Sequence, residues 1–216
     1  MAVIVLNGPP ASGKDVCCEY LKDNGYIHIE FKKQLFQDVI KYYGVDEEWF
    51  FGGYTREVKD QKEYLLKGKS RREALIHVSE NIQKVKYGQD YYGFVAASGM
   101  DTDKNYCISD GGFVPELSHI INKFGKDDVQ FIRLYRDGCN YLADSRRYIK
   151  FDFVLKEFVL GHASDTTLYQ DQFFDDIVNV GGYVIHNNGN MPELYKSLEH
   201  IVRAHNDRKN TVKIGF

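Results

Sequence analysis

The chain has 216 residues, of which 43% are hydrophobic and 27% are charged, and its formal net charge is −3. This length fits one compact α/β domain, or a core domain that carries an inserted subdomain. The small negative charge predicts no overall attraction to DNA or to an anionic membrane, although it leaves room for a local basic groove.

Cysteine usage and the N-terminus indicate the compartment. The cysteines are scattered and form no Cys-x-x-Cys pair for zinc, which is typical of free thiols in a reducing cytoplasm. They are Cys17, Cys18, Cys107 and Cys139. The N-terminal apolar run, Ala2 to Leu6, is too short for a signal peptide or a membrane span. We therefore expect a cytoplasmic protein with no membrane partner.

The first predicted elements are a buried strand at Ala2–Leu6 and a helix at Asp15–Asp23. The segment between them reads Gly8-Pro-Pro-Ala-Ser-Gly-Lys14-Asp15. A strand, a glycine-bounded loop, a lysine and a helix in this order indicate a phosphate-binding loop. The glycines let successive N–H groups point at phosphate oxygens, and the helix adds its positive N-terminal end. The alternative is a plain glycine turn between strand and helix.

This loop predicts an ATP site. The residues expected to bind its phosphates are Gly8, Ala11, Ser12, Gly13, Lys14 and Asp15. Lys14 should reach the β- and γ-phosphates and act in catalysis. The residue after this lysine is usually Ser or Thr, whose hydroxyl binds Mg²⁺, whereas here Asp15 and then Val16 follow. A carboxylate can hold Mg²⁺ directly or through water, so we expect Asp15 to be a metal ligand.

The next elements follow in chain order. Tyr26–Phe31 is predicted as a strand and Lys32–Tyr43 as a helix, from its apolar spacing. The segment Gly44–Gly68 is rich in charge, Tyr and Gly, which suits a mobile insert better than a core element. A helix is expected over Ser70–Lys86, because Ser70 is followed three residues later by Glu73, a capping signal. Its predicted apolar face consists of Ala74, Leu75, Val78, Ile82 and Val85.

The rest of the chain again alternates between the two element types. Strands are expected at Asn105–Ser109, Val129–Tyr135 and Tyr183–His186, and helices at Tyr91–Ala97, Val114–Lys123 and Pro192–His205. The polar tail, Asn206 to Phe216, should be loosely held.

Strands that alternate with helices predict a three-layer α/β fold with a parallel sheet of about five strands and helices on both faces. We expect a single domain over residues 1–216. Its core would comprise residues 1–31, 103–138 and 175–206, with a helical insert at 32–102 and a lid at 139–174. In such sheets ligands bind at the carboxyl ends of the strands, where polar residues gather here.

Asp110 and Arg136 occupy two of these strand exits, while Arg71 and Arg72 open a predicted helix and Arg146 and Arg147 lie in the predicted lid. Asp110 follows a predicted strand, where phosphate-loop enzymes place an acid to hold the Mg²⁺ water shell. Its alternative role is that of a helix N-cap. Arginine offers a rigid fork for phosphoryl oxygens. Each arginine alone fits an exposed surface, but together they suggest one phosphate clamp for the donor and one for the acceptor; they are Arg71, Arg72, Arg136, Arg146 and Arg147.

The chain resembles the bacteriophage deoxynucleoside monophosphate kinases, a part of the adenylate-kinase-like group, along most of its length. The shared features are Ser12–Asp15 in the loop, the Phe- and Lys-containing segment Phe31–Leu35, and the Arg71-Arg72 helix followed by Asp90-Tyr91-Tyr92. They continue with Asp110 and the downstream Glu116, Arg136 after a strand, the polar segment Asp144–Arg147, and Asn187-Asn188-Gly189. Val16 and the Gly44–Gly68 segment depart from that pattern.

The resemblance implies ATP, Mg²⁺ and transfer of the γ-phosphoryl group to a deoxynucleoside monophosphate by a monomer or homodimer in the host cytoplasm. It implies catalytic roles for Lys14, Arg136, Arg146 and Arg147, and ATP binding by Asn188. By the same analogy the acceptor-binding residues are Phe31, Lys32, Arg71, Arg72, Asp90 and Tyr91. The metal ligands would be Asp15 and Asp110.

Two other functions stay open. Similar phage kinases phosphorylate 5-hydroxymethyluracil within DNA, and the basic, aromatic stretch from Lys59 to Tyr92 is compatible with a bound strand. The net charge of −3 argues against a polymer partner. The other alternative is a module that senses or hydrolyses ATP, although paired arginines exceed what one phosphate clamp needs. The sequence has no H-E-x-x-H or G-x-S-x-G motif, which excludes the corresponding hydrolases.

Overall fold

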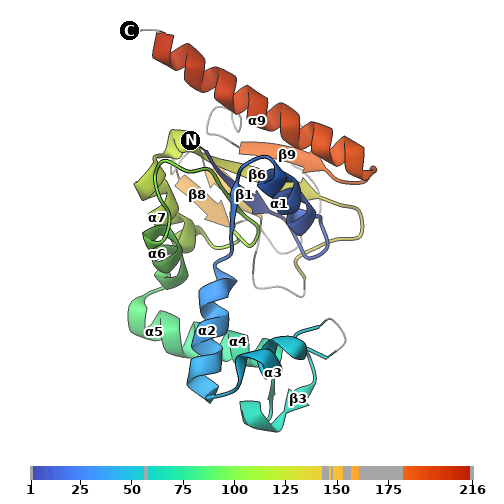
Figure 1. Ribbon diagram of the computed structural model, residues 1–216, viewed down its shortest axis with the longest axis vertical. Coiled ribbons are helices and arrows are strands. Elements are labelled where there is room, and N and C mark those ends of the chain that lie inside the picture. The colour runs from blue at the N-terminus through green and yellow to red at the C-terminus, as the bar shows by residue number, and fades with distance from the viewer. Residues whose placement is uncertain are drawn as a thin grey trace.

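The computed structural model describes residues 2–55, 58–142, 146, 148–152, 157–160 and 182–214. Its centre is a five-stranded parallel sheet in the order β2-β5-β1-β6-β9 (Figure 1). The strands are β1 (Val3–Asn7), β2 (Ile27–Ile29), β5 (Tyr106–Ile108), β6 (Val129–Tyr135) and β9 (Gly182–His186). The predicted α/β fold with a parallel sheet is confirmed.

The central strands are buried on both faces, as the apolar runs in their sequences require. Every residue of β1 and β6 is buried. In the parallel register, Val3 lies opposite Tyr106 of β5 on one side and opposite Val129 of β6 on the other. Strand β1 is therefore hydrogen-bonded to a neighbouring strand on each side, which fixes the start of the loop that follows it.

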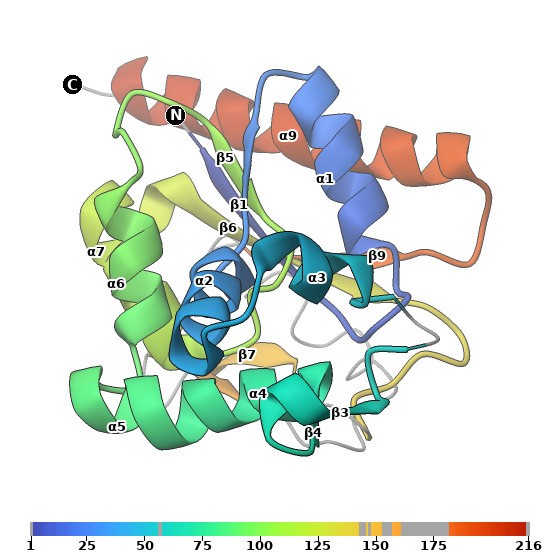
Figure 2. The same cartoon turned by 60° about the horizontal axis from the view of Figure 1, so that its bottom comes forward.

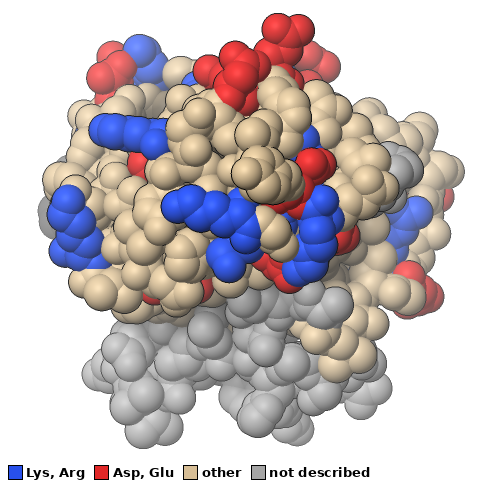
Figure 3. Space-filling model, turned by 90° about the horizontal axis from the view of Figure 1, so that it is seen from below, with Lys and Arg blue, Asp and Glu red and all other residues tan. Residues whose placement is uncertain are grey.

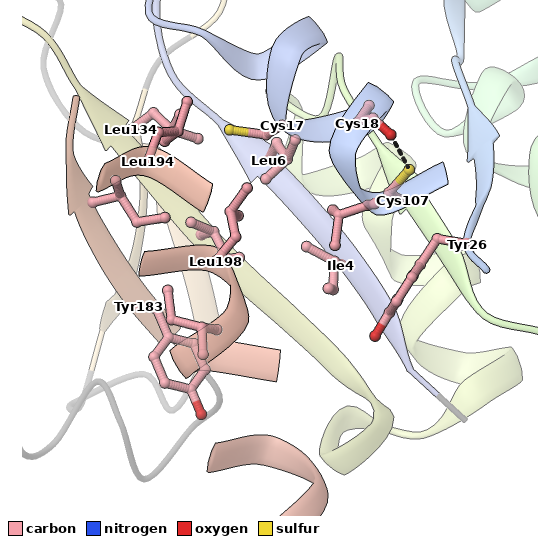
Figure 4. Packing of buried hydrophobic residues seen from close by; sticks show 14 of the residues in the cluster. Ile4, Leu6, Cys17, Cys18, Tyr26, Cys107, Leu134, Tyr183, Leu194 and Leu198 are labelled. Carbon is pink, nitrogen blue, oxygen red and sulfur yellow. Dashed lines mark hydrogen bonds between the residues drawn. The ribbon is translucent and has the colours of Figure 1, made fainter. Parts of the chain in front are cut away.

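Helices cover both faces of this sheet. On one face α1 (Lys14–Asp23) and α9 (Met191–Ile214) pack over side chains such as Ile4, Leu6 and Leu134, and Figure 4 shows this cluster at close range. On the other face α6 (Tyr91–Ser98) and α7 (Val114–Phe124) pack over Val3 and Val5. Because side chains alternate along a strand, β1 contributes to both layers.

The helical insert has a core of its own (Figure 2). It comprises α2 (Lys32–Tyr43), α3 (Glu47–Gly52), the short strands β3 (Lys62–Glu63) and β4 (Lys69–Ser70), α4 (Arg71–Ile76) and α5 (Lys84–Tyr87). A 3₁₀ turn, Tyr64–Leu66, joins β3 to β4. The buried residues of this core are Phe36, Val39, Phe50, Leu66, Ala74, Leu75 and Val78.

The segment Gly44–Gly68 lies in the insert as expected, but the expectation that it contributes no core element was wrong. Asp46 caps α3 by accepting a hydrogen bond from the Trp49 N–H, and both Phe50 and Leu66 are fully buried. The segment has many charged and glycine residues, but its few large apolar side chains, among them Phe50 and Leu66, pack in the core of the insert.

The helix predicted over Ser70–Lys86 begins as expected, but its apolar face does not continue. Ser70 and Glu73 form a capping box at the start of α4. A π-helical stretch, His77–Gln83, then separates α4 from α5. A π turn holds more residues than an α turn, so it rotates the following side chains. Val85 is consequently 76% exposed, whereas Lys84 is buried.

The C-terminal half of the chain is described in part. Strands β7 (Ile149–Asp152) and β8 (Glu157–Leu160) form an antiparallel pair, and a 3₁₀ turn, Lys126–Asp128, precedes β6. Helix α9 extends to Ile214 rather than ending near His205, because no Gly or Pro interrupts residues 206–214. Most of the predicted lid lies outside the described residues. Within those residues, no helix is both long and apolar enough to cross a membrane.

The topology defines where a ligand can bind. Strands β1 and β5 are neighbours, but β1 leads into α1 on one face of the sheet and β5 leads into α7 on the other. Such a change of direction opens a crevice beyond the carboxyl ends of the two strands. The loops that flank it are residues 8–13 and 109–113.

Candidate functional site

The loop after β1 has the geometry of a phosphate cradle. Gly13 has a φ of +107° and the non-glycine Ala11 a φ of +64°, and α1 begins at Lys14. The Lys14 ammonium donates to the carbonyl oxygens of Gly8 and Pro9 at 2.6 and 2.7 Å. A Cβ at Gly8 would lie 2.8 Å from the Leu134 carbonyl oxygen, so only glycine fits there. The buried Ser12 hydroxyl has no hydrogen-bond partner among the described residues.

A residue after the last strand holds this loop from behind. The Asn187 side-chain amide donates to the Ser12 carbonyl oxygen at 2.8 Å and lies where a Cβ at Gly13 would be. The sequence analysis assigned ATP binding to the neighbouring Asn188, whose side chain instead accepts from the Asp137 N–H at 2.9 Å. Adjacent identical residues at a strand exit could not be distinguished without the backbone.

Arg136 also contacts the loop. Its guanidinium donates to the Ala11 carbonyl oxygen at 3.3 Å, and the residue is exposed. Arg136 follows β6, as predicted, and brings a positive charge to the loop after β1. Its catalytic role stays a prediction.

Asp110 makes a contact that neither sequence interpretation anticipated. Its two carboxylate oxygens accept the backbone N–H groups of Phe31 and Lys32 at 3.0 and 2.9 Å, at the start of α2. Burial raises the pKa of Asp110, and these two N–H groups act in the opposite direction. The helix that Asp110 stabilises is thus α2 of the insert, not the following helix α7, which begins at Val114 and whose N-cap residue Phe113 makes no side-chain cap hydrogen bond.

The residues present fit an Mg²⁺ ion held mainly by phosphate oxygens and water. No cluster of three or more His, Cys, Asp or Glu residues occurs in the part of the chain that the structure describes. Mg²⁺ at nucleotide sites needs only one or two carboxylates, however. Asp15 offers an exposed carboxylate in the first turn of α1, and Asp15 and Asp110 both act electrostatically on Lys32. Their metal role stays a prediction.

A cavity of about 340 Å³, called the main cavity below, lies between the exit of β5 and the insert. Four cationic side chains, three acidic side chains and four aromatic rings line this cavity, some from the insert and some from the segments that follow the sheet strands. Figure 3 shows Lys and Arg side chains close together on the face that carries the insert, with Asp and Glu side chains among them. The lining residues are Phe31, Lys32, Leu35, Tyr54, Arg72, Leu75, Ile76, Ser79, Glu80, Lys84, Tyr92, Asp110, Phe113, Glu116 and Arg146.

Sequence reasoning gave no role to the most deeply buried charges in this cavity, Lys84 and Glu116. The side chain of Lys84 is 3% exposed and that of Glu116 5%, and the Lys84 nitrogen lies 3.9 Å from a Glu116 carboxylate oxygen. Burial raises the pKa of Glu116 to about 8, and the charge of Lys84 opposes that rise. Lys84 was missed because the π stretch turns it inward from a position that an α-helix would expose.

The two arginines that open α4 have different surroundings. Arg72 lines the main cavity, as expected for an acceptor residue, and pairs with Asp60 at 2.7 Å. Arg71 does not line it. The Arg71 guanidinium pairs with Glu63 at 2.6 Å and donates to the carbonyl oxygens of Phe50 and Trp49. The expected acceptor role of Arg71 is therefore corrected to one inside the insert, where its guanidinium joins Glu63 to the backbone of α3.

Asp90 and Tyr91 also lie away from the main cavity. They line a separate surface hollow with Tyr87, Phe94 and His119. Asp90 pairs with the His119 ring nitrogen at 2.7 Å, which holds the pKa of Asp90 below its usual range. The ring that reaches the main cavity is that of the next residue, Tyr92, because successive helical positions face different directions.

Phe31, Lys32 and Arg146 do line the main cavity. Arg146 packs over Gly112, where a Cβ would lie 2.7 Å from its side chain. Arg147 lies outside the described residues. The structure thus brings together Phe31, Lys32, Arg72 and Arg146 around one cavity and separates them from Arg71, Asp90 and Tyr91.

Comparison with known proteins adds little. No protein-family model matches the chain, and no curated protein is similar to it. A gluconokinase from Sinorhizobium meliloti 1021 aligns over 97% of this chain and 97% of its own, at 13% identity and a TM-score of 0.43. A dephospho-CoA kinase from Campylobacter jejuni aligns over 94% and 96%, at 10% identity and a TM-score of 0.42. Both TM-scores lie below 0.5, and the fold is defined by the order and direction of the five strands.

Proposed function

We propose that the protein is an ATP-dependent kinase that transfers the γ-phosphoryl group to a deoxynucleoside monophosphate. The observation that carries the proposal is the main cavity, which gathers three cations of the insert and Arg146 at the exit of β5. Strand β5 is the neighbour of β1, whose exit carries the phosphate-type loop. A kinase needs two anion sites at adjoining positions, one for the donor and one for the acceptor.

The loop at residues 8–15 is the donor site. The Lys14 ammonium now satisfies two loop carbonyl oxygens, so it is held in place and can exchange one of them for a phosphate oxygen. The Ser12 hydroxyl and the N–H groups at the start of α1 supply further donors. Arg136 adds positive charge at the side of β6.

Mg²⁺ would be held by Asp15, through water or directly, with Asp110 in its outer surroundings. When bound, the ion neutralises charge on the phosphate oxygens. Asp110 has a second task in this proposal. Through its hydrogen bonds to Phe31 and Lys32 it fixes the start of α2, and with it the cavity wall that Lys32 contributes.

The main cavity is the acceptor site. Its volume of about 340 Å³ lies near the lower end of small-molecule pockets, which are about 300–1,000 Å³, and so suits one mononucleotide. Phe31, Tyr54 and Phe113 supply ring surface for a base. Lys32, Arg72 and Arg146 supply charge for a phosphate, and the arginines can bind two oxygens at once.

Phosphate transfer from γ-labelled ATP tests the proposal. The acceptors are the four deoxynucleoside monophosphates and single- or double-stranded DNA with 5-hydroxymethyluracil, and a reaction without acceptor measures ATP hydrolysis. Label on a mononucleotide, lost in Lys14→Ala, is the expected result. Label on DNA alone would favour the polymer-acting alternative, and phosphate release that no acceptor changes would favour an ATPase module.

A further inference from the structure

Glu116 is a buried acid that pairs with Lys84 at 3.9 Å, a distance too long for a hydrogen bond. It lies in the first turn of α7, is 4% exposed, and lines the main cavity. No hydrogen-bond donor among the described residues reaches its carboxylate, and Lys84 is 3.9 Å away. A buried carboxylate whose oxygens accept no hydrogen bond costs free energy, even when a cation lies nearby. A molecule in the cavity is therefore the natural source of its donors.

The position of Glu116 is fixed by close backbone packing. A Cβ at Gly93 of α6 would lie 1.9 Å from the Glu116 carbonyl oxygen, so the two helices approach each other at a distance that only glycine permits. The carboxyl group is thus held on rigid elements. This is the condition that a site needs if it is to distinguish ligands by their hydrogen-bonding pattern.

Lys84 is fixed beside it. Its nitrogen donates to a Glu80 carboxylate oxygen at 2.8 Å and lies 4.4 Å from the centre of the Phe113 ring. The cavity wall therefore presents a donor-only ammonium next to an acceptor-only carboxylate. The ligand edge that matches this wall must offer one acceptor to Lys84 and two donors to Glu116.

Resting on the function proposed above, we propose that Glu116 and Lys84 read the base of the acceptor and select guanine. The Watson–Crick edge of guanine carries the O6 acceptor beside two adjacent donors, N1–H and N2–H. These donors fit the two carboxylate oxygens of Glu116, and O6 fits the ammonium of Lys84. The acceptor is accordingly a guanine deoxynucleoside monophosphate.

The other bases leave a mismatch at this wall. Thymine has only one donor on that edge, and its second carbonyl oxygen would face a carboxylate oxygen. Adenine and cytosine each have one amino donor beside a ring nitrogen that accepts, so one carboxylate oxygen would stay unpaired. A buried polar group without a partner discriminates strongly between ligands.

The assignment requires Glu116 to be ionised, which makes guanine binding dependent on pH. Burial raises the pKa of Glu116, as do the facing acids Asp110 and Glu80, while Lys84 and Arg146 lower it. The two guanine donors stabilise the ionised carboxylate. Affinity for guanine should therefore rise with pH until Glu116 is ionised in the free protein, and then become constant.

The test measures kcat/KM and calorimetric binding for dGMP, dAMP, dCMP and dTMP, between pH 6 and 9, for the wild type, Glu116→Gln and the exposed control Glu199→Gln. Glutamine keeps the size of the side chain but offers one donor and one acceptor. We expect the wild type to prefer dGMP by about 10-fold or more, from the discrimination typical of bidentate base contacts. Glu116→Gln should lose that preference, gain relative activity on dAMP or dTMP, and lose the pH dependence of dGMP binding.

The outcomes separate the two proposals. A wild type that phosphorylates several mononucleotides without preferring dGMP overturns the guanine assignment alone. An equal loss on all four nucleotides in a folded Glu116→Gln variant also overturns it, since that result indicates a structural role. A wild type that phosphorylates no mononucleotide overturns the proposed function and this inference with it.

Discussion

Replacing Arg71 by lysine should destabilise the protein without a selective effect on the acceptor. The Arg71 side chain is 4% exposed, and its three guanidinium nitrogens reach Glu63, Phe50 and Trp49. Lysine can keep the ion pair with Glu63, but its single nitrogen cannot reach both carbonyl oxygens as well.

The magnitude follows from the contacts that are lost. A hydrogen bond from a charged group contributes about 1.5–3 kcal/mol. The guanidinium also lies 4.2 Å from the centre of the Trp49 ring, a contact that contributes ~1 kcal/mol. With partial retention of the Glu63 pair, we expect Arg71→Lys to lower the free energy of unfolding by about 2–4 kcal/mol.

The neighbouring residue provides the control. The Arg72 side chain is 46% exposed, and its pair with Asp60 lies at the surface. Arg72→Lys should therefore change stability by about 0–1 kcal/mol. It should instead raise KM for the acceptor more than KM for ATP, because Arg72 lines the main cavity.

Urea unfolding followed by tryptophan fluorescence measures the first effect, since Trp49 is the only tryptophan in the chain. Steady-state kinetics with both substrates varied measure the second. The reasoning fails if Arg71→Lys unfolds like the wild type while its acceptor KM rises selectively, because Arg71 would then serve the acceptor after all.

Four further predictions concern the loop and the cavity. Lys14→Ala should lower turnover by about 100-fold or more with the fold retained, measured by single-turnover kinetics and circular dichroism, and near-normal turnover would contradict the kinase assignment. Asn187→Ala should raise KM for ATP several-fold more than Asn188→Ala, because only Asn187 contacts Ser12; equal effects in ATP titrations would refute this. Asp15→Asn should need more Mg²⁺ for half-maximal rate, and an unchanged Mg²⁺ titration would remove Asp15 from the metal site. Glu116→Gln should unfold at a higher urea concentration than the wild type above pH 8, but not at pH 4. The pKa of Glu116 is 4.5 in the unfolded chain and is raised to about 8 in the folded protein. Ionisation of Glu116 therefore lowers the stability of the wild type progressively as the pH rises above 4.5. Equal midpoints at both pH values would argue against a buried acid with a raised pKa.

The sheet and the phosphate-type loop could be predicted because their signals are local. Apolar runs such as Ala2–Leu6 match buried parallel strands, and the order of glycines and Lys14 fixes a loop between strand and helix. The topology rules for parallel sheets then place the strand exits at one edge.

The cavity could be predicted only in part, because side-chain direction depends on contacts that are distant in sequence. The π stretch at His77–Gln83 turns Lys84 inward, and nothing in the local pattern distinguishes it from an α-helix. Arg71 and Arg72 look alike in sequence, yet one is buried by α3 and the other is not. Asp110 likewise caps a helix that begins almost eighty residues earlier, a contact that no local signal predicts.

The separate core of the insert has a thermodynamic consequence. Phe50, Leu66 and their neighbours pack on one another, and Leu35 is shared with the core beneath the sheet. Because most of each core packs on itself, we expect the insert to open locally at a lower free energy than the sheet. The main cavity lies between them, so its occupant contacts both. Ligand binding should then raise the free energy of that local opening by RT ln(1 + [L]/Kd), because the open form no longer offers both walls of the cavity.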